Sequence, residues 1–182
     1  MKIIETGFKG LNLIQPKIFT DQRGYFFESY KQEALHRAGI EFNPVQDNES
    51  KSVYGVIRGL HYQLEPYAQA KLFRVVLGRI YDVAVDLRRN SPTFGKWFGV
   101  ELDSENKLQL FIPEGFAHGF SVLSDIAVIH YKCNNFYNSE YERGINVFDP
   151  ELNIDWKLKD VQPILSQKDR NHPFFKDAER NF

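Results

Sequence analysis

Two histidines of this chain stand in glycine-rich segments whose other residues are mostly apolar. His61 lies in the stretch GVIRGLHYQ, and His118 lies in the stretch PEGFAHGF. An imidazole titrates near neutral pH, so either side chain could act as a general base or as a metal ligand. A single histidine is more often a hydrogen-bonded core residue. Which chemistry applies therefore depends on the elements that position these two side chains.

The segments around the histidines have the pattern of short β-strands. Residues 81–87 (YDVAVDL) alternate apolar side chains with aspartate and alanine, which is the period-two pattern of a half-buried strand. Further strands, each bounded by Gly, Pro, Asn, Asp or Ser, are predicted over residues 55–63, 71–77, 99–102, 108–113, 119–123 and 126–133. We therefore predict an all-β protein, built as an antiparallel sandwich or barrel.

One short surface helix is predicted, over residues 31–38. Ser29 is expected to cap it, Gln32 stands at the capping-box position, and Gly39 can take the left-handed conformation that ends a helix. From about residue 149 onward, spaced prolines and weak periodicity predict mostly irregular chain packed over the barrel. A length of 182 residues with 42% hydrophobic residues fits a single domain.

The composition of the chain argues against several classes of binding partner. The chain has 23 basic and 24 acidic residues, so no broad positive field attracts it to nucleic acid or to an anionic membrane. Cys133 is the only cysteine, which excludes an intrachain disulfide framework and suits a reducing compartment. The first residues lack an apolar run of signal-peptide length, and no later run is long enough to span a membrane. We expect a cytoplasmic protein with neither nucleic acid nor membrane as a partner.

The two histidine segments resemble the two motifs of the cupin superfamily, whose fold is a double-stranded β-helix, or jelly roll. In metal-binding cupins the first motif supplies a His-x-His pair and a later Glu, but here the residue two past His61 is Gln63. The loss of one imidazole leaves a poor site for a first-row transition metal. Lys71 would repel a dication if it faces the same cavity. Glu65 could help as a ligand, but we expect no metal ion and no cofactor.

The same segments, together with further stretches in the same order, resemble the dTDP-4-dehydrorhamnose 3,5-epimerases over nearly the whole chain. The matching stretches are DQRGYFFE (21–28), QDN (46–48), RGLHYQ (58–63), KL (71–72), DLRRNSPTFG (86–95), PEGFAHGF (113–120), YK (131–132) and LSQKD (165–169). These enzymes are cofactor-free cupins of nucleotide-activated L-rhamnose synthesis. The implied reaction inverts the two carbons that flank the C4 ketone of dTDP-4-dehydro-6-deoxy-α-D-glucose and gives dTDP-4-dehydro-β-L-rhamnose.

The resemblance implies four catalytic residues. His61 is the base, paired with Asp169, because a carboxylate fixes the tautomer of an imidazole and stabilises the imidazolium that forms. Tyr131 is the acid that returns a proton on the opposite face of the sugar. Within residues 126–133 it alternates in phase with apolar residues, so it is expected to face the interior. Lys71 faces the ketone, where a preorganised positive charge stabilises the enolate oxygen.

The resemblance also implies a set of substrate-binding residues. Arginine suits a diphosphate because its planar fork donates two parallel hydrogen bonds, and an aromatic ring can stack on thymine. The nucleotide and its diphosphate are assigned to Arg23, Gln46, Asp47, Asn48 and Arg58, the thymine to Tyr137 and the sugar to His118, with Glu28, Glu142 and Lys168 completing the set.

One of these assignments conflicts with strand geometry. Strict alternation places Arg58 on the strand face opposite His61. Either a bulge at Gly59 re-aims one of the two side chains, or Arg58 reaches the site of a neighbouring subunit.

A homodimer is implied as well, in which N-terminal segments exchange and place Arg23 and Glu28 in the partner's site. Residues 1–182 would then form one cupin-type domain serving the synthesis of cell-surface polysaccharide. The alternatives are an enzyme that inverts only C3 or only C5, a 3,4-ketoisomerase acting on the same sugar nucleotide, and a non-catalytic carbohydrate-binding cupin. The joint presence of His61, Asp169 and Tyr131 favours epimerisation, because inversion needs a proton donor on the face opposite the base.

Overall fold

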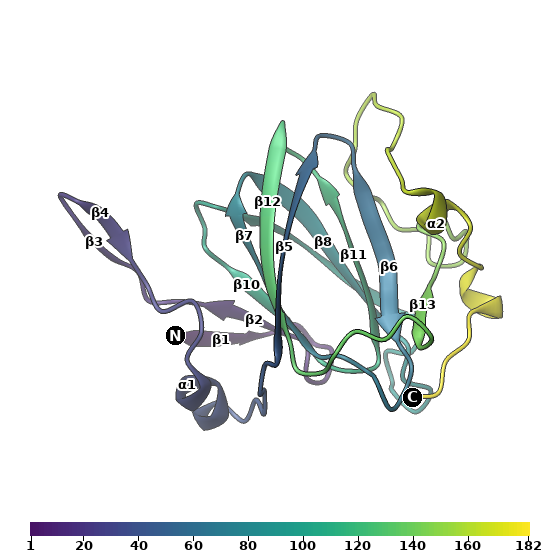
Figure 1. Cartoon of the computed structure of the whole chain (residues 1–182), viewed down its shortest axis with the longest axis horizontal. Coiled ribbons are helices and arrows are strands. Elements are labelled where there is room, and N and C mark those ends of the chain that lie inside the picture. Colours follow the sequence, from purple (N-terminus) through teal and green to yellow (C-terminus); the bar gives the residue numbers. More distant parts are fainter.

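Two antiparallel β-sheets face each other in the computed structural model, which describes all 182 residues (Figure 1). The six-stranded sheet has the order β1 (Lys2–Glu5), β2 (Asn12–Gln15), β10 (Gln109–Ile112), β7 (Lys71–Leu77), β12 (Ile126–Cys133) and β5 (Gln46–Val53). The five-stranded sheet has the order β13 (Glu142–Gly144), β6 (Ile57–Gln63), β11 (Phe116–Val122), β8 (Arg79–Asp86) and β9 (Trp97–Asp103). The prediction of an all-β protein is confirmed.

A core of apolar side chains fills the space between the sheets. Phe73 and Ile129 contribute to it from the six-stranded sheet, and Ala84 and Phe120 contribute from the five-stranded sheet. Each large apolar side chain that is fully buried stabilises the fold by about 1.5–3 kcal/mol. The strands predicted over residues 71–77 and 126–133 are confirmed at both ends, as β7 and β12.

The prediction that residues 81–87 form a half-buried strand is wrong, because β8 is buried on both faces. Ile80 and Ala84 point into the core between the sheets. Tyr81 and Val83 belong instead to a second apolar cluster, to which the C-terminal segment contributes residues such as Trp156. That segment is largely irregular and covers the outer face of the five-stranded sheet, as predicted (Figure 1).

Strand β5 was not predicted, because its inward face is polar. Along Gln46–Val53 the side chains alternate between partly buried or buried and exposed, and the inward positions are Gln46, Asn48, Ser50 and Ser52. Period-two alternation is therefore present in burial but absent in hydrophobicity. The polar lining marks this part of the interior as a cavity rather than core.

The helices are short. Helix α1 (Gln32–Arg37) begins after Lys31, which makes no side-chain capping bond, so the prediction of a Ser29 cap is wrong. Gly39 has φ +76° and follows the helix in the left-handed conformation, as predicted. Helix α2 (Gln167–Arg170) and the 3-10 turn Phe175–Asp177 lie in the C-terminal segment. None of the helices is long and apolar enough to cross a membrane.

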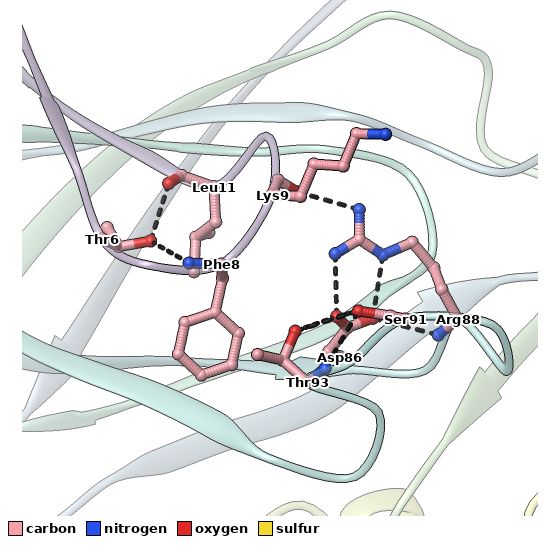
Figure 2. Close-up of polar contacts among 8 residues, drawn as sticks. All are labelled: Thr6, Phe8, Lys9, Leu11, Asp86, Arg88, Ser91 and Thr93. Carbon is pink, nitrogen blue, oxygen red and sulfur yellow. Dashed lines mark hydrogen bonds and ion pairs between the residues drawn. The ribbon is translucent and has the colours of Figure 1, made fainter.

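At the end of β8 a buried carboxylate organises the turn toward β9 (Figure 2). Asp86 accepts hydrogen bonds from Arg88 Nε and Nη2 at 2.8 and 2.7 Å, from Ser91 Oγ at 2.6 Å and from Thr93 Oγ1 at 2.7 Å. Burial by itself would raise the pKa of Asp86, but these hydrogen bonds hold it below its ordinary value. Arg88 Nη1 also donates to the carbonyl oxygen of Lys9 at 2.9 Å, which ties the N-terminal loop to the sheet. The stretch 86–95 thus has a structural role.

The third pair of strands stands apart from the sandwich. Strands β3 (Phe19–Asp21) and β4 (Gly24–Phe26) form a two-stranded hairpin that projects from the end of the molecule opposite α2 (Figure 1). All six of its strand residues are exposed, including Phe19, Tyr25 and Phe26. A hairpin of this size is only marginally stable alone, and its exposed rings suggest a contact with another molecule.

Candidate active site

A polar cavity of about 300 Å³ opens between the two sheets. Its lining includes half of the residues predicted to act on or bind substrate: His61, Lys71, Tyr131, Gln46, Asn48, Tyr137 and Glu142. A larger hollow of about 760 Å³, next to the N-terminal strands and α1, contains none of the predicted site residues. The smaller cavity is therefore the candidate active site.

His61 and Asp169 form a hydrogen-bonded pair on one wall of this cavity. His61 lies on β6, and its Nε2 is 2.7 Å from Oδ1 of Asp169, 108 residues later in the sequence. Asp169 is fixed by α2, where its backbone N–H donates to the capping hydroxyl of Ser166 at 3.0 Å. Because Nε2 faces the carboxylate, Nδ1 is the ring nitrogen left free to accept a proton.

The carboxylate of Asp169 is deeply buried, with 5% of its side chain exposed. Burial would raise its pKa, but the neighbouring imidazole of His172, 3.6 Å away, and the hydrogen-bonded imidazole of His61 hold the pKa far below the ordinary value. Asp169 therefore stays ionised at neutral pH, as an imidazolium partner requires.

Tyr131 and Lys71 lie on the opposite wall. They belong to β12 and β7 of the six-stranded sheet, whereas His61 belongs to the five-stranded sheet. Tyr131 faces inward as predicted and stacks on Phe73, with ring centroids 5.3 Å apart and planes 26° apart.

Burial shifts the pKa values of both side chains on this wall. It raises the pKa of the Tyr131 phenol and keeps the hydroxyl protonated at neutral pH. It lowers the pKa of Lys71, an effect opposed by the nearby Cys133, Asp82 and Glu142.

A second histidine–aspartate pair lies behind the first. His118 on β11 is the register partner of His61 on β6, and both His118 and Asp82 are buried. His118 Nε2 is 2.7 Å from Asp82 Oδ1. Burial lowers the pKa of His118, and the charge of Asp82 opposes that shift. Sequence reasoning missed Asp82; the available signal was an aspartate on the buried face of an apolar strand.

The bulge expected at Gly59 is present. The β6–β11 register shifts between His118 and Phe120, and Gly59 has φ +140°. A Cβ at this position would lie 2.6 Å from Cα of Gly119, so only glycine fits. Arg58 reaches toward the other sheet and donates from Nε to Ser52 Oγ on β5 at 3.0 Å. The bulge thus removes the conflict between Arg58 and His61.

Gln63, which replaces the second histidine of the cupin motif, holds the loop at the cavity mouth. Its Nε2 donates to the carbonyl oxygens of Tyr67 at 2.7 Å and Phe136 at 3.1 Å, and its Oε1 accepts from the backbone N–H of Asn138 at 2.6 Å. The side chain is buried and its amide is fully engaged. Gln63 therefore acts as a cross-link between β6 and the loop that contains Tyr137.

Tyr137 is held in place from two further directions. Its hydroxyl donates to Oε2 of Glu142 at 2.5 Å, and its backbone N–H donates to Oε1 of Gln46 at 3.1 Å. Glu142 also forms an ion pair with Lys168. The Tyr137 ring remains 54% exposed, so one face is available for stacking.

Six predicted binding residues do not line the cavity: Arg58, His118 and Lys168, whose contacts are given above, and Asp47, Arg23 and Glu28, which point elsewhere. Asp47 faces outward from β5, with both carboxylate oxygens 2.8 Å from Lys132 Nζ. Arg23 lies in the projecting hairpin and pairs with Asp21. Glu28 follows that hairpin and pairs with Lys31 at 3.1 Å. In a single chain none of the side chains of Asp47, Arg23 and Glu28 lines the cavity that contains His61.

His172 is a site residue that no sequence motif indicated. Its ring lies edge-on to His61 with centroids 5.6 Å apart, and its Nε2 is 3.6 Å from Asp169 Oδ1. The only signal in the sequence was its position three residues after Asp169.

Two facing antiparallel sheets with a polar cavity between them fit the jelly roll of a cupin, and an imidazole and a phenol on opposite walls of the cavity suit a sugar epimerase. Residues 5–177 match the family model described as dTDP-4-dehydrorhamnose 3,5-epimerase. The chain is 55% identical to dTDP-4-dehydrorhamnose 3,5-epimerase of Shigella flexneri over 180 residues, covering 98% of each protein.

Solved structures agree with this match. The epimerase from Elizabethkingia anophelis is 53% identical, with a TM-score of 0.93 and 97% of each chain covered. The dTDP-6-deoxy-D-glucose-3,5-epimerase from Legionella pneumophila, in complex with dTDP-4-keto-L-rhamnose, is 49% identical, with a TM-score of 0.91, covering 95% of this chain and 92% of that chain. The chain belongs to the dTDP-4-dehydrorhamnose 3,5-epimerase family. It is an isomerase, and the family and fold predicted from its sequence are confirmed.

Proposed function

We propose that this chain converts dTDP-4-dehydro-6-deoxy-α-D-glucose to dTDP-4-dehydro-β-L-rhamnose by removing and returning protons at C3 and C5. The observation that supports it best is that His61 and Tyr131 line one cavity from opposite sheets. Inversion requires a base on one face of the sugar and a donor on the other, and this arrangement provides both.

His61 is the proposed base. Its Nδ1 takes the proton from the carbon beside the ketone, while Asp169 accepts the Nε2–H hydrogen bond and stabilises the imidazolium. A positioned base of this kind contributes a rate factor on the order of 10²–10⁴.

Lys71 is the proposed partner of the ketone oxygen. As the proton leaves, negative charge develops on that oxygen, and an N–H donor already in place needs no reorganisation. Such preorganised donors contribute roughly 3–4 kcal/mol. His118, held by Asp82 in the same interior, is proposed to contact the sugar.

Tyr131 is the proposed acid. Its hydroxyl, kept protonated by burial, donates to the carbon from the face opposite His61. After one inversion His61 holds the proton taken from the substrate, and Tyr131 is a phenolate. Both groups must then exchange protons with solvent, so each inverted carbon acquires a solvent hydrogen.

The cavity mouth is the proposed nucleotide site. Tyr137 offers a ring face to thymine, and Arg58 supplies positive charge for the diphosphate. Gln46, Asn48, Glu142 and Lys168 surround this mouth and complete the proposed contacts.

A homodimer is proposed because Arg23 and Glu28 do not line the cavity of their own chain. The hairpin that precedes Glu28 projects from the sandwich with exposed aromatic rings, which suits insertion beside a second copy (Figure 1). The chain would then be one cupin-type domain with an N-terminal exchange segment and a C-terminal extension from about residue 149. We further propose a cytoplasmic enzyme that supplies cell-surface polysaccharide synthesis and binds neither nucleic acid nor membrane.

Incubation with the substrate in deuterium oxide, followed by NMR, tests this function. Deuterium at both C3 and C5 is the expected result. Label at one carbon indicates a mono-epimerase, a shifted carbonyl indicates a ketoisomerase, and no exchange indicates a binding protein.

Two further measurements test the residue roles. His61→Asn should abolish exchange and leave dTDP affinity nearly intact, whereas His36→Asn, at an exposed histidine of α1, should change neither. Exchange retained by His61→Asn would mean that another residue is the base. A chelator should leave the activity unchanged, and a loss restored by a divalent metal would contradict the metal-free mechanism.

A further inference from the structure

The buried nitrogen of His172 has no hydrogen-bond partner. Only 10% of the side chain is exposed, and its Nε2 makes no hydrogen bond within the protein. The nearest charged atom is Asp169 Oδ1 at 3.6 Å, beyond hydrogen-bond length. A buried polar atom without a partner is uncommon and requires an explanation, of which a bound ion is one.

This nitrogen lies in a cluster with the catalytic pair. One ligand atom each from His61, Asp169 and His172 all lie within 4.8 Å of one another. The distance from His61 Nε2 to Asp169 Oδ1 is 2.7 Å, and the distance from His172 Nε2 to the same oxygen is 3.6 Å. Tetrahedral zinc with bonds of about 2.0–2.1 Å holds its ligand atoms ~3.3 Å apart, so small side-chain shifts bring these atoms into range.

We propose that His61, Asp169 and His172 form an inhibitory zinc site that switches off the catalytic base. Two imidazoles and a carboxylate suit zinc far better than magnesium or calcium, which prefer oxygen ligands. The site differs from the metal centre of other cupins, because Gln63 occupies that position and its amide is engaged elsewhere. Solvent supplies the fourth ligand on the cavity side, where His61 is 32% exposed.

The tautomer of His61 explains the inhibition. In the active form the proton of the neutral ring is on Nε2 and faces Asp169, which leaves Nδ1 free. Zinc binds the lone pair of Nε2, so the ring proton must move through solvent to Nδ1. That nitrogen can then no longer accept the proton of the substrate.

Charge limits the affinity of this site. Asp169 supplies one negative charge and Glu142 adds another on the adjacent strand, but Lys71 and Lys168 oppose a dication. The metal lies behind His61 and leaves the nucleotide contacts at the mouth free. Zinc should therefore lower kcat and leave the dissociation constant for dTDP unchanged.

Direct binding tests the site without reference to catalysis. The full-length chain, freed of metal, is titrated with zinc chloride by calorimetry and with cobalt(II) by absorption. One site per chain with tetrahedral cobalt bands is expected, and it should be lost in His172→Asn. His36→Asn is the matched control, because it removes an exposed histidine and should retain the site. No site in the native chain, or an equal signal in His172→Asn, would overturn the proposal.

Inhibition by zinc is the second measurement. Unlike the binding titration, it rests on the proposed function. In the deuterium exchange assay, His172→Asn removes one zinc ligand and so lowers the affinity for zinc. The zinc concentration that gives half-inhibition should therefore rise by about tenfold or more. Each inhibited rate is compared with the same variant's own rate without zinc, so that a change in basal activity does not enter the result, and His172→Phe provides a second variant that keeps a ring over Gly144. Magnesium should not inhibit. Zinc that competes with dTDP, or inhibits both variants as strongly as the native chain, would refute the mechanism.

Discussion

Replacing Gln63 with methionine should weaken nucleotide binding much more than it slows the chemistry. The substitution keeps the length of the side chain but removes three hydrogen bonds, to Tyr67, Phe136 and Asn138. At about 0.5–1.5 kcal/mol each, these bonds contribute roughly 1.5–4.5 kcal/mol. The loop is partly exposed, so water replaces part of what is lost, and about 2 kcal/mol remains.

The lost hydrogen bonds hold in place the loop that contains Tyr137, the residue proposed to stack on thymine. At about 1.4 kcal/mol per tenfold change, a loss of 2 kcal/mol corresponds to a dissociation constant for dTDP raised by about 30-fold. His61, Tyr131 and Lys71 make no contact with the lost amide, so kcat should fall by less than about threefold. Calorimetric titration with dTDP and steady-state kinetics measure the two effects separately.

Gln109 provides a matched control. It is as buried as Gln63, but neither atom of its amide has a hydrogen-bond partner. Gln109→Met should therefore leave dTDP binding unchanged and raise the free energy of unfolding by about 1–3 kcal/mol, measured in urea. The reasoning is refuted if the two variants behave alike, or if Gln63→Met loses kcat while its affinity for dTDP stays native.

Two further predictions concern stability. Gly59→Ala should lower the free energy of unfolding by about 3 kcal/mol or more, because the added Cβ would collide with Gly119. Gly24→Ala is the control: its φ is also positive, but no atom lies within 4 Å of the added Cβ, so it should cost only about 1 kcal/mol. Equal losses of stability in urea unfolding would contradict the steric argument. Asp86→Asn should lower the free energy of unfolding by about 3 kcal/mol at neutral pH, since it removes the negative charge that pairs with the largely buried Arg88. Because folding lowers the pKa of Asp86, its contribution is complete above the ordinary carboxyl pKa of about 4 and is lost as the pH falls below that value. Urea unfolding should thus show a smaller gap between Asp86→Asn and the native chain at acid pH, and a gap independent of pH would count against the assignment.

The strands of this fold were predictable where apolar residues alternate with polar ones. Strands β7 and β12 were found at both ends because one face of each is apolar and packs in the core. Strand β5 was not found, because Gln46 and Asn48 face a cavity rather than core. Likewise, the burial of β8 on both faces depends on the C-terminal segment, whose docking no local pattern encodes.

The residues of the candidate site were predictable only where they lie in a sequence motif that resembles the family. Resemblance singled out His61, Asp169, Tyr131 and Lys71, and the structure brings all four to one place. Asp82 and His172 were missed because their importance comes from register and from the path of the C-terminal segment. Asp82 pairs with His118, 36 residues later, and His172 lies against His61, which belongs to a distant strand, and neither composition nor periodicity contains such contacts.

The long separation of His61 and Asp169 has a consequence for the chain during its synthesis. A ribosome completes His61 108 residues before it reaches Asp169. Until the C-terminal segment emerges and docks, the sandwich holds an imidazole with no carboxylate to set its tautomer. The His61–Asp169 pair therefore cannot form before residue 169 has been made and the C-terminal segment has docked on the sandwich.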